Sequence, residues 1–232
     1  MVTKKIKGRG RPPGRTVRGE RTKARLYAVA TQLFAERGYE STTLRAIATE
    51  AGVSPTLLYK HFPSKLAVVL QLYDELSHTF EGKAHELPVG GWQGNSIATL
   101  RTSLEVLHPH REVLRALIPV LVADPDNGLF SPANAASGER VKACFLAAVT
   151  EADDAPEHEL AEAIGRLLYL LQLAVILWWL LDRSEGQWTT AQLVALLEQV
   201  SGLLKPMLPL ASGPILQLDR LASAGLMGSS HG

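Results

Sequence analysis

Hydroxyl, aromatic and basic side chains at spacings suited to nucleic-acid recognition lie between residues 43 and 65. Thr43 and Ser54 each precede a run of apolar residues, where a hydroxyl caps a helix and backbone N–H groups favour a phosphate. Tyr59 and Lys60 follow Ser54 by about one and a half helical turns. A tyrosine can stack on or donate to a base, and a lysine can pair with a phosphate. The chemistry that these side chains offer is binding to a polyanion.

Two short helices joined by a tight turn must position those side chains. Residues 44–61, LRAIATEAGVSPTLLYKH, have helix-turn-helix form, with small Ala48 where two helices cross and Gly52 at the turn. We expect an inner face that holds the second helix on the first, made by Val53, Leu57 and Leu58. The outer face, directed at a major groove, then holds Pro55, Thr56, Tyr59 and Lys60. A plain helical hairpin whose polar face meets only water would show the same pattern.

Charge is distributed unevenly along the 232 residues, although the net charge is only +1. Residues 1–65 hold 14 Lys and Arg against 4 Asp and Glu, and the remainder has a net charge of −9. A basic head on an acidic body indicates that a polyanion, either nucleic acid or a membrane surface, binds at one end. The 46% hydrophobic content excludes a wholly disordered chain.

Evidence for an enzyme, a metal site or export is weak. The sequence holds no G-x-S-x-G, Walker A, H-E-x-x-H or G-x-G-x-x-G motif. Asp153-Asp154 reads as a helix start, and His108 and His110 lack partners at ligand spacing, so we expect no cofactor and no metal. The single cysteine, Cys144, and the absence of a signal-peptide pattern favour a reducing, cytoplasmic location.

Helical periodicity predicts an all-α protein with no alternating strand. One helix runs from Glu20 to about Gly38, and a long helix covers 64–86 after the helix-turn-helix. Further helices are expected near 96–107, 110–123, 137–152, 157–183 and 189–205, separated by Pro- and Gly-containing breaks. The predicted organisation is an arm at 1–18, a DNA-binding domain at 19–66, a ligand-binding and dimerisation domain at 67–206 and a tail at 207–232.

Residues 21–66 resemble the DNA-binding domain of TetR-family transcriptional repressors. The resemblance lies in Ala30 and Leu33-Phe34-Ala35-Glu36-Arg37-Gly38-Tyr39, then in Thr42-Thr43-Leu44-Arg45-Ala46-Ile47-Ala48 and Ala51-Gly52-Val53-Ser54, and in Leu58-Tyr59-Lys60-His61-Phe62-Pro63-Ser64-Lys65. The order and spacing of these blocks are unbroken over about a fifth of the chain. The helices beyond residue 66 are similar to that family's ligand-binding domain only in number and length.

The resemblance implies a role in DNA binding for particular residues. It places Pro55, Thr56 and Tyr59 at positions that reach bases, and Lys60, His61 and Lys65 at positions that contact the DNA backbone. Thr43, Arg45 and Ser54 complete the set at the starts of the two helices. Two alternatives stay open, because Ser54 can be only a helix cap and His61 can be packed partly under Phe62.

The N-terminal arm departs from the minimal family pattern. Arg9-Gly10-Arg11-Pro12 is similar to the core of an AT-hook, in which arginines lie in a narrow minor groove. Arg9 and Arg11 are the candidate contacts. A nonspecific basic tail that adds only charge-dependent affinity is an equally good interpretation.

The remaining helices predict a ligand cavity and a subunit interface. Candidate cavity residues are Leu104, Leu107, Leu117, Leu121, Phe145, Tyr169, Gln172 and Leu173, although most of these could be ordinary core. The window 167–181 is apolar except for Gln172 but is shorter than a membrane span, so we expect a second subunit to cover part of it. A homodimer through 157–205 is therefore predicted, without a membrane.

These features together predict a ligand-responsive DNA-binding regulator, with a repressor as the expected form. A homodimer would bind a palindromic operator in double-stranded DNA and be released by a small, largely apolar effector. The alternative is an architectural protein that coats AT-rich DNA and has no small-molecule effector.

Overall fold

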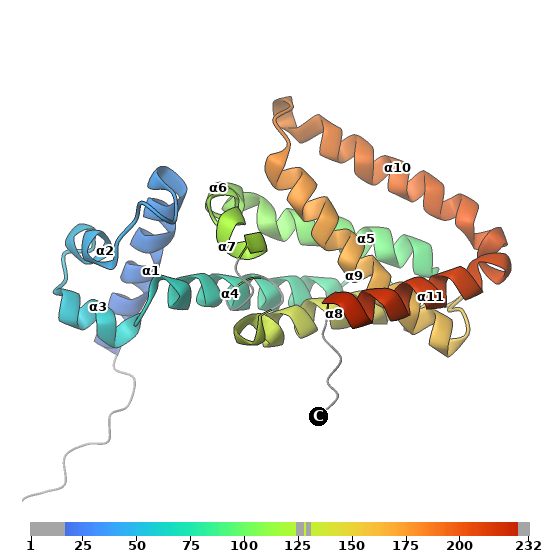
Figure 1. Cartoon of the computed structure of the whole chain (residues 1–232), viewed down its shortest axis with the longest axis horizontal. Coiled ribbons are helices and arrows are strands. Elements are labelled where there is room, and N and C mark those ends of the chain that lie inside the picture. Colours follow the sequence, from blue (N-terminus) through green and yellow to red (C-terminus); the bar gives the residue numbers. More distant parts are fainter. Residues whose placement is uncertain (1–16, 124–127, 129–130, 227–232) are drawn as a thin grey trace, which may run out of the picture.

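A computed structural model describes residues 17–123, 128 and 131–226, and every regular element within them is helical. The helices are α1 (Val17–Arg37), α2 (Leu44–Glu50), α3 (Pro55–His61), α4 (Lys65–His85), α5 (Trp92–Leu107), α6 (Arg111–Ala116), α7 (Ile118–Ala123), α8 (Ala135–Thr150), α9 (His158–Leu181), α10 (Trp188–Leu204) and α11 (Leu208–Leu226). Figure 1 shows α1–α3 as a head at one end and α4 running from it into the body. The all-α prediction is confirmed.

The head folds around one face of α1. The buried residues of this helix recur at three- and four-residue steps, which give an amphipathic helix its apolar stripe, and they are Leu26, Ala30, Leu33 and Phe34. Gly38 ends α1 in a left-handed conformation (φ +82°), where a side chain would be strained. Thr42 is buried beneath this turn, and its hydroxyl donates to the Gly38 carbonyl oxygen at 2.8 Å. The α1–α2 connection is thus fixed by local chemistry.

The helix-turn-helix follows the geometry expected from its sequence, with one exception. Ala48 is buried at the crossing of α2 and α3, and Gly52 takes a φ of +62° at the turn between them. Leu58 is buried and anchors α3, but Leu57 is 36% exposed and so leaves the predicted inner face. Leu57 lies on the outward side because α3 has only two turns, and one buried leucine occupies the contact with α2.

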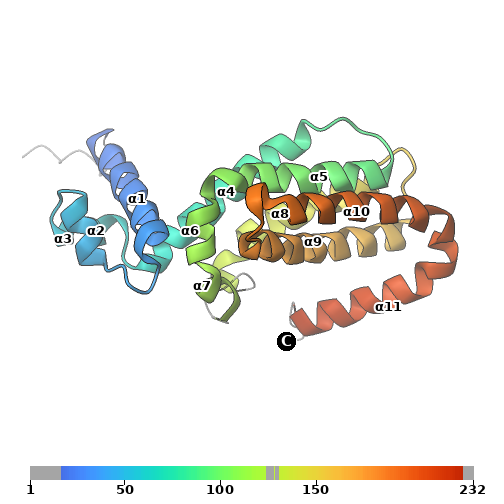
Figure 2. The same cartoon turned by 90° about the horizontal axis from the view of Figure 1, so that it is seen from above.

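The body packs α8 against α4, α5 and α9. Gly165 of α9 permits the closest of these approaches, because a Cβ at this position would lie 2.8 Å from the Cα of Leu146 in α8. Figure 2 shows the body, with α5, α8, α9 and α10, extending to the right of the head. Within the described residues, α9 is the one helix with a length and composition that would suit a membrane crossing. Tyr169, Val175 and Trp179 of α9 are nevertheless buried against neighbouring helices.

Two helices of the body differ from the sequence-based expectations. The helix expected at 96–107 begins at Trp92, whose backbone N–H donates to the Asp154 carboxylate at 2.8 Å. The helix expected at 110–123 divides at Leu117 into α6 and α7. The sequence does not predict this division, because Leu117 continues the apolar pattern of a single helix.

Most of the segment that the sequence analysis named a tail, residues 207–232, is helical. Leu208–Leu226 form α11, which runs back from the far end of the body toward the head (Figures 1 and 2). Arg166 of α9 donates to both Asp219 oxygens, at 3.0 and 2.9 Å, and so holds α11 on α9. Pro214 lies inside α11, where it removes one backbone hydrogen bond. Tertiary contacts to α9 therefore outweigh the Pro- and Gly-rich local sequence.

Candidate DNA-binding surface and ligand cavity

The recognition helix α3 offers an exposed surface on a fixed support. Pro55, Thr56 and Lys60 are exposed, and the side chain of Tyr59 is 50% exposed. Leu58 on the opposite side of the helix is buried in the head. All four predicted outward residues thus lie on one accessible face, which could enter a major groove without unfolding any part of the head.

Helix caps set the ends of the short helices and keep their hydroxyls near the surface. Thr43 accepts from the Ala46 amide at 3.1 Å, and Ser54 accepts from the Leu57 amide at 3.3 Å. Each hydroxyl keeps its O–H for a further acceptor, so capping and phosphate contact are compatible. Arg45 is exposed in the first turn of α2, beside Thr43.

Lys65 has an intramolecular role that the sequence did not reveal. Its ammonium donates to the Tyr39 carbonyl oxygen at 2.7 Å and lies 4.2 Å from the centroid of the Tyr39 ring. The side chain is half-buried between the start of α4 and the α1–α2 connection. A phosphate contact by Lys65 would compete with these partners. His61 is also half-buried, whereas Lys60 is exposed. Arg9 and Arg11 lie outside the described residues.

A cavity of about 360 Å³ lies in the body between α4–α9. Five of the eight residues predicted for a ligand site line it, and they are Leu107, Leu121, Tyr169, Gln172 and Leu173. The lining also includes residues that the sequence did not single out, among them Tyr73, Leu76 and Phe80 of α4. The apolar periodicity of α4 predicts that these residues are buried, but it does not distinguish residues that line a cavity from residues packed in the core.

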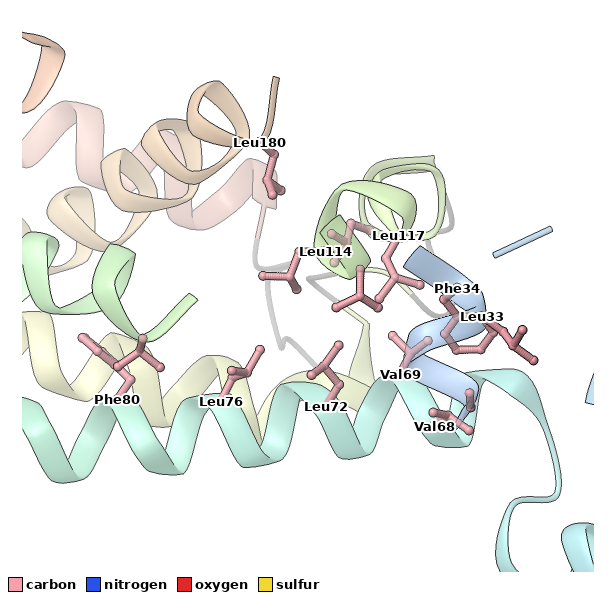
Figure 3. Packing of buried hydrophobic residues seen from close by; sticks show 14 of the residues in the cluster. Leu33, Phe34, Val68, Val69, Leu72, Leu76, Phe80, Leu114, Leu117 and Leu180 are labelled. Atoms are coloured by element: carbon pink, nitrogen blue, oxygen red, sulfur yellow. The ribbon is translucent and has the colours of Figure 1, made fainter. Parts of the chain in front are cut away.

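Leu104, Leu117 and Phe145 are not among the described residues that line the cavity. Phe145 is buried behind the wall and stacks on Phe80, with ring centroids 6.2 Å apart. Leu104 is partly buried against the main core. Leu117 is fully buried at the junction with the head (Figure 3). Each side chain fills a helix contact, which is the commoner use of an apolar residue.

Helix α6 and the start of α7 connect the cavity to the head. Leu114 and Ile118 line the cavity, and Leu117 lies between them in sequence. Figure 3 shows Leu117 beside Phe34 of α1 and Val69 of α4, within the same hydrophobic cluster. A change in the cavity that moved α6 would therefore reach α1 directly.

Arg111 fixes the first turn of α6 to the end of α9. Its guanidinium donates to the carbonyl oxygens of Trp179 at 3.0 Å and of Asp182 at 2.6 Å. It also lies 5.6 Å from the centroid of the Trp179 ring. The side chain is only 13% exposed, so these bonds replace water at carbonyls that α9 leaves unpaired at its C-terminus.

The geometry of the head matches a known class of bacterial DNA-binding proteins. Residues 26–72 fit the family model described as "Bacterial regulatory proteins, tetR family". Over these residues the chain is similar to the N-terminal helix-turn-helix domain of that family.

Two curated relatives are similar mainly over the same region. The HTH-type transcriptional activator FasR of Mycolicibacterium smegmatis is 38% identical over 73 residues, which cover 29% of this chain and 33% of that protein. The HTH-type transcriptional repressor KstR2 of Rhodococcus jostii is 36% identical over 91 residues, covering 38% and 44%. The match thus spans less than half the length of these relatives. Both of these relatives are named as transcriptional regulators.

Solved structures share the fold over most of the chain. Salmonella enterica GusR superposes with a TM-score of 0.62 at 21% identity, covering 83% of this chain and all of that one. A tetR-family regulator from Streptomyces coelicolor gives a TM-score of 0.57 at 21% identity, covering 87% and 89%. The similarity of the body is therefore one of fold.

Proposed function

We propose that the protein is a ligand-responsive transcription regulator that binds operator DNA in the cytoplasm as a homodimer. The observation that carries the proposal is the exposed face of α3, rigidly held by Leu58, in a head that matches the TetR DNA-binding domain. The surplus of basic residues within 1–65 supports electrostatic attraction to DNA.

The homodimer is supported by unpartnered apolar side chains on the last helices of the body. Eight side chains of α9 and α10 are each more than a third exposed, namely Leu171, Leu177, Trp178, Leu181, Trp188, Leu196, Val200 and Leu203. Leu193 and Leu197, which lie within the predicted interface segment 157–205, instead pack partly into the main core. Two helices from each subunit would cover these side chains in a four-helix interface and give the twofold symmetry that a palindrome requires.

Release by an effector is supported by the two helices that join cavity and head. Leu76 and Phe80 of α4 line the cavity, while the N-terminus of α4 follows the recognition helix directly. Helix α6 adds a second connection, through Leu114 at the cavity and Leu117 against α1. A ligand that moves α4 and α6 would change the distance between the two α3 helices of the dimer. The helical repeat of DNA requires one particular distance, so the changed dimer would bind DNA more weakly.

A footprinting experiment would test this function against the architectural alternative. Duplexes that bind the protein would be selected from a random pool, and the bases that the protein protects would then be mapped. We expect one short inverted repeat with its half-sites about one helical turn apart. Extended protection of AT-rich DNA without twofold symmetry would contradict the regulator and favour the architectural protein. The presence of a cavity in the body already favours the regulator, since coating DNA makes no use of such a cavity.

A further inference from the structure

The cavity contains polar groups that have no partner within the described part of the chain. Gln172 of α9 lines the cavity and is only 3% exposed, yet its Oε1 makes no hydrogen bond there. The hydroxyl of Tyr73, which lines the cavity from α4, is also buried and unpaired. A buried polar atom is unstable without a hydrogen-bond partner, so two such atoms in one wall indicate that a ligand group pairs with them.

The wall around these two groups is mostly apolar, with a few other uncharged polar side chains such as Ser77 and Ser103. No Asp, Glu, Lys, Arg or His occurs among the described residues that line the cavity. Arg140 comes near, because it donates to the lining residue Ser77 at 2.5 Å. Its guanidinium is already paired with Asp74 at 3.3 Å and Glu81 at 3.6 Å. A charged group placed in this cavity would therefore lose its hydration without gaining an unengaged counter-ion.

We infer that the cavity takes an uncharged, mostly hydrocarbon molecule that carries a hydroxyl group, which pairs with Gln172 or Tyr73. An amide and a phenol can each donate and accept, and an alcohol is the simplest ligand group that also does both. A carboxylate can only accept, and its charge would be buried. This inference rests on the proposed ligand control, but it concerns binding alone.

The volume of the cavity sets the size of the ligand. At about 30 Å³ for each water-sized group, 360 Å³ holds roughly twelve non-hydrogen atoms. Decan-1-ol has a size in this range, and sodium decanoate and methyl nonyl ether have nearly the same length. The three probes differ mainly at the polar end, which is an alcohol, a carboxylate or an acceptor without a donor.

The experiment measures the dissociation constant of each probe by calorimetry with the full-length protein, without DNA. We expect decan-1-ol to bind at least tenfold more tightly than the ether, and the ether to bind more tightly than decanoate. Preference for decanoate, or equal affinity for all three probes, would overturn the inference. Failure of the bound alcohol to release DNA would instead refute ligand control and leave the inference intact.

Three variants locate the bound hydroxyl. Gln172→Leu and Tyr73→Phe keep the approximate shape of the wall, and at least one of them should reduce the advantage of the alcohol over the ether by about tenfold. Ser131→Ala is the matched control, because the Ser131 hydroxyl is also buried and unpaired but does not line the cavity. An unchanged alcohol preference in both cavity variants would overturn the assignment, and circular dichroism would verify that each variant folds.

Discussion

Replacing Arg111 by methionine tests whether α6 is held in place by the end of α9. Methionine keeps an unbranched apolar stem but removes the donors that reach Trp179 and Asp182 at 3.0 and 2.6 Å. Hydrogen bonds from a charged donor contribute about 1.5–3 kcal/mol, and the 13% exposure of Arg111 limits compensation by water. We therefore expect a loss of about 2 kcal/mol, which lowers Tm by roughly 4–8 °C for a chain of this size.

Arg101→Met provides a matched control for this measurement. Arg101 pairs with Glu198 at 2.7 Å, but both side chains are about half exposed, so the pair contributes about 0–1 kcal/mol. Thermal unfolding followed by circular dichroism should therefore separate the two variants clearly. If Arg111→Met melted at the same temperature as Arg101→Met, the inference that Arg111 fixes α6 would be wrong.

Further predictions concern the head, the interface and the body. Lys60→Ala should weaken binding to all DNA sequences and reduce the salt slope by about one per lost contact, whereas Tyr59→Ala should change the preferred site, as measured by titration at several salt concentrations. Trp178→Glu should yield a monomer in light scattering, because it places a charge on the proposed interface, and a dimer of unchanged stability would contradict that interface. Gly165→Ala should destabilise the protein by about 1–3 kcal/mol in urea, since its Cβ would meet α8 backbone at 2.8 Å. Burial raises the pKa of Tyr169 from 10.0 to about 12, so stability present below pH 10 should fall as pH rises toward 12, and Tyr169→Phe should remove part of that fall.

The helix-turn-helix could be predicted closely because its signals are local. Ser54 caps α3 and Pro55 occupies its first turn, so the observed helix starts and ends where the sequence places it. The contact of Lys65 with Tyr39, in contrast, could not be predicted from local sequence. Its partner is a carbonyl oxygen 26 residues earlier in the chain, and no spacing rule reports such a contact.

The body was harder to predict because packing decides it. Leu107 and Leu117 have the same residue type and similar helical surroundings, yet one lines the cavity and the other fills the junction with the head. Only the relative placement of α1, α4 and α6 distinguishes them. In the same way, α11 forms where local sequence argues against a helix, because Asp219 pairs with Arg166 on another element.

Coupling between the cavity and the DNA-binding surface can be measured by reciprocal binding of a ligand and DNA. The best-bound of the ten-carbon probes would be titrated into the protein alone and into the protein saturated with its selected inverted repeat. A coupling of about 3 kcal/mol predicts that DNA weakens probe binding roughly a hundredfold. Equal affinity of the probe in the two titrations would contradict the account.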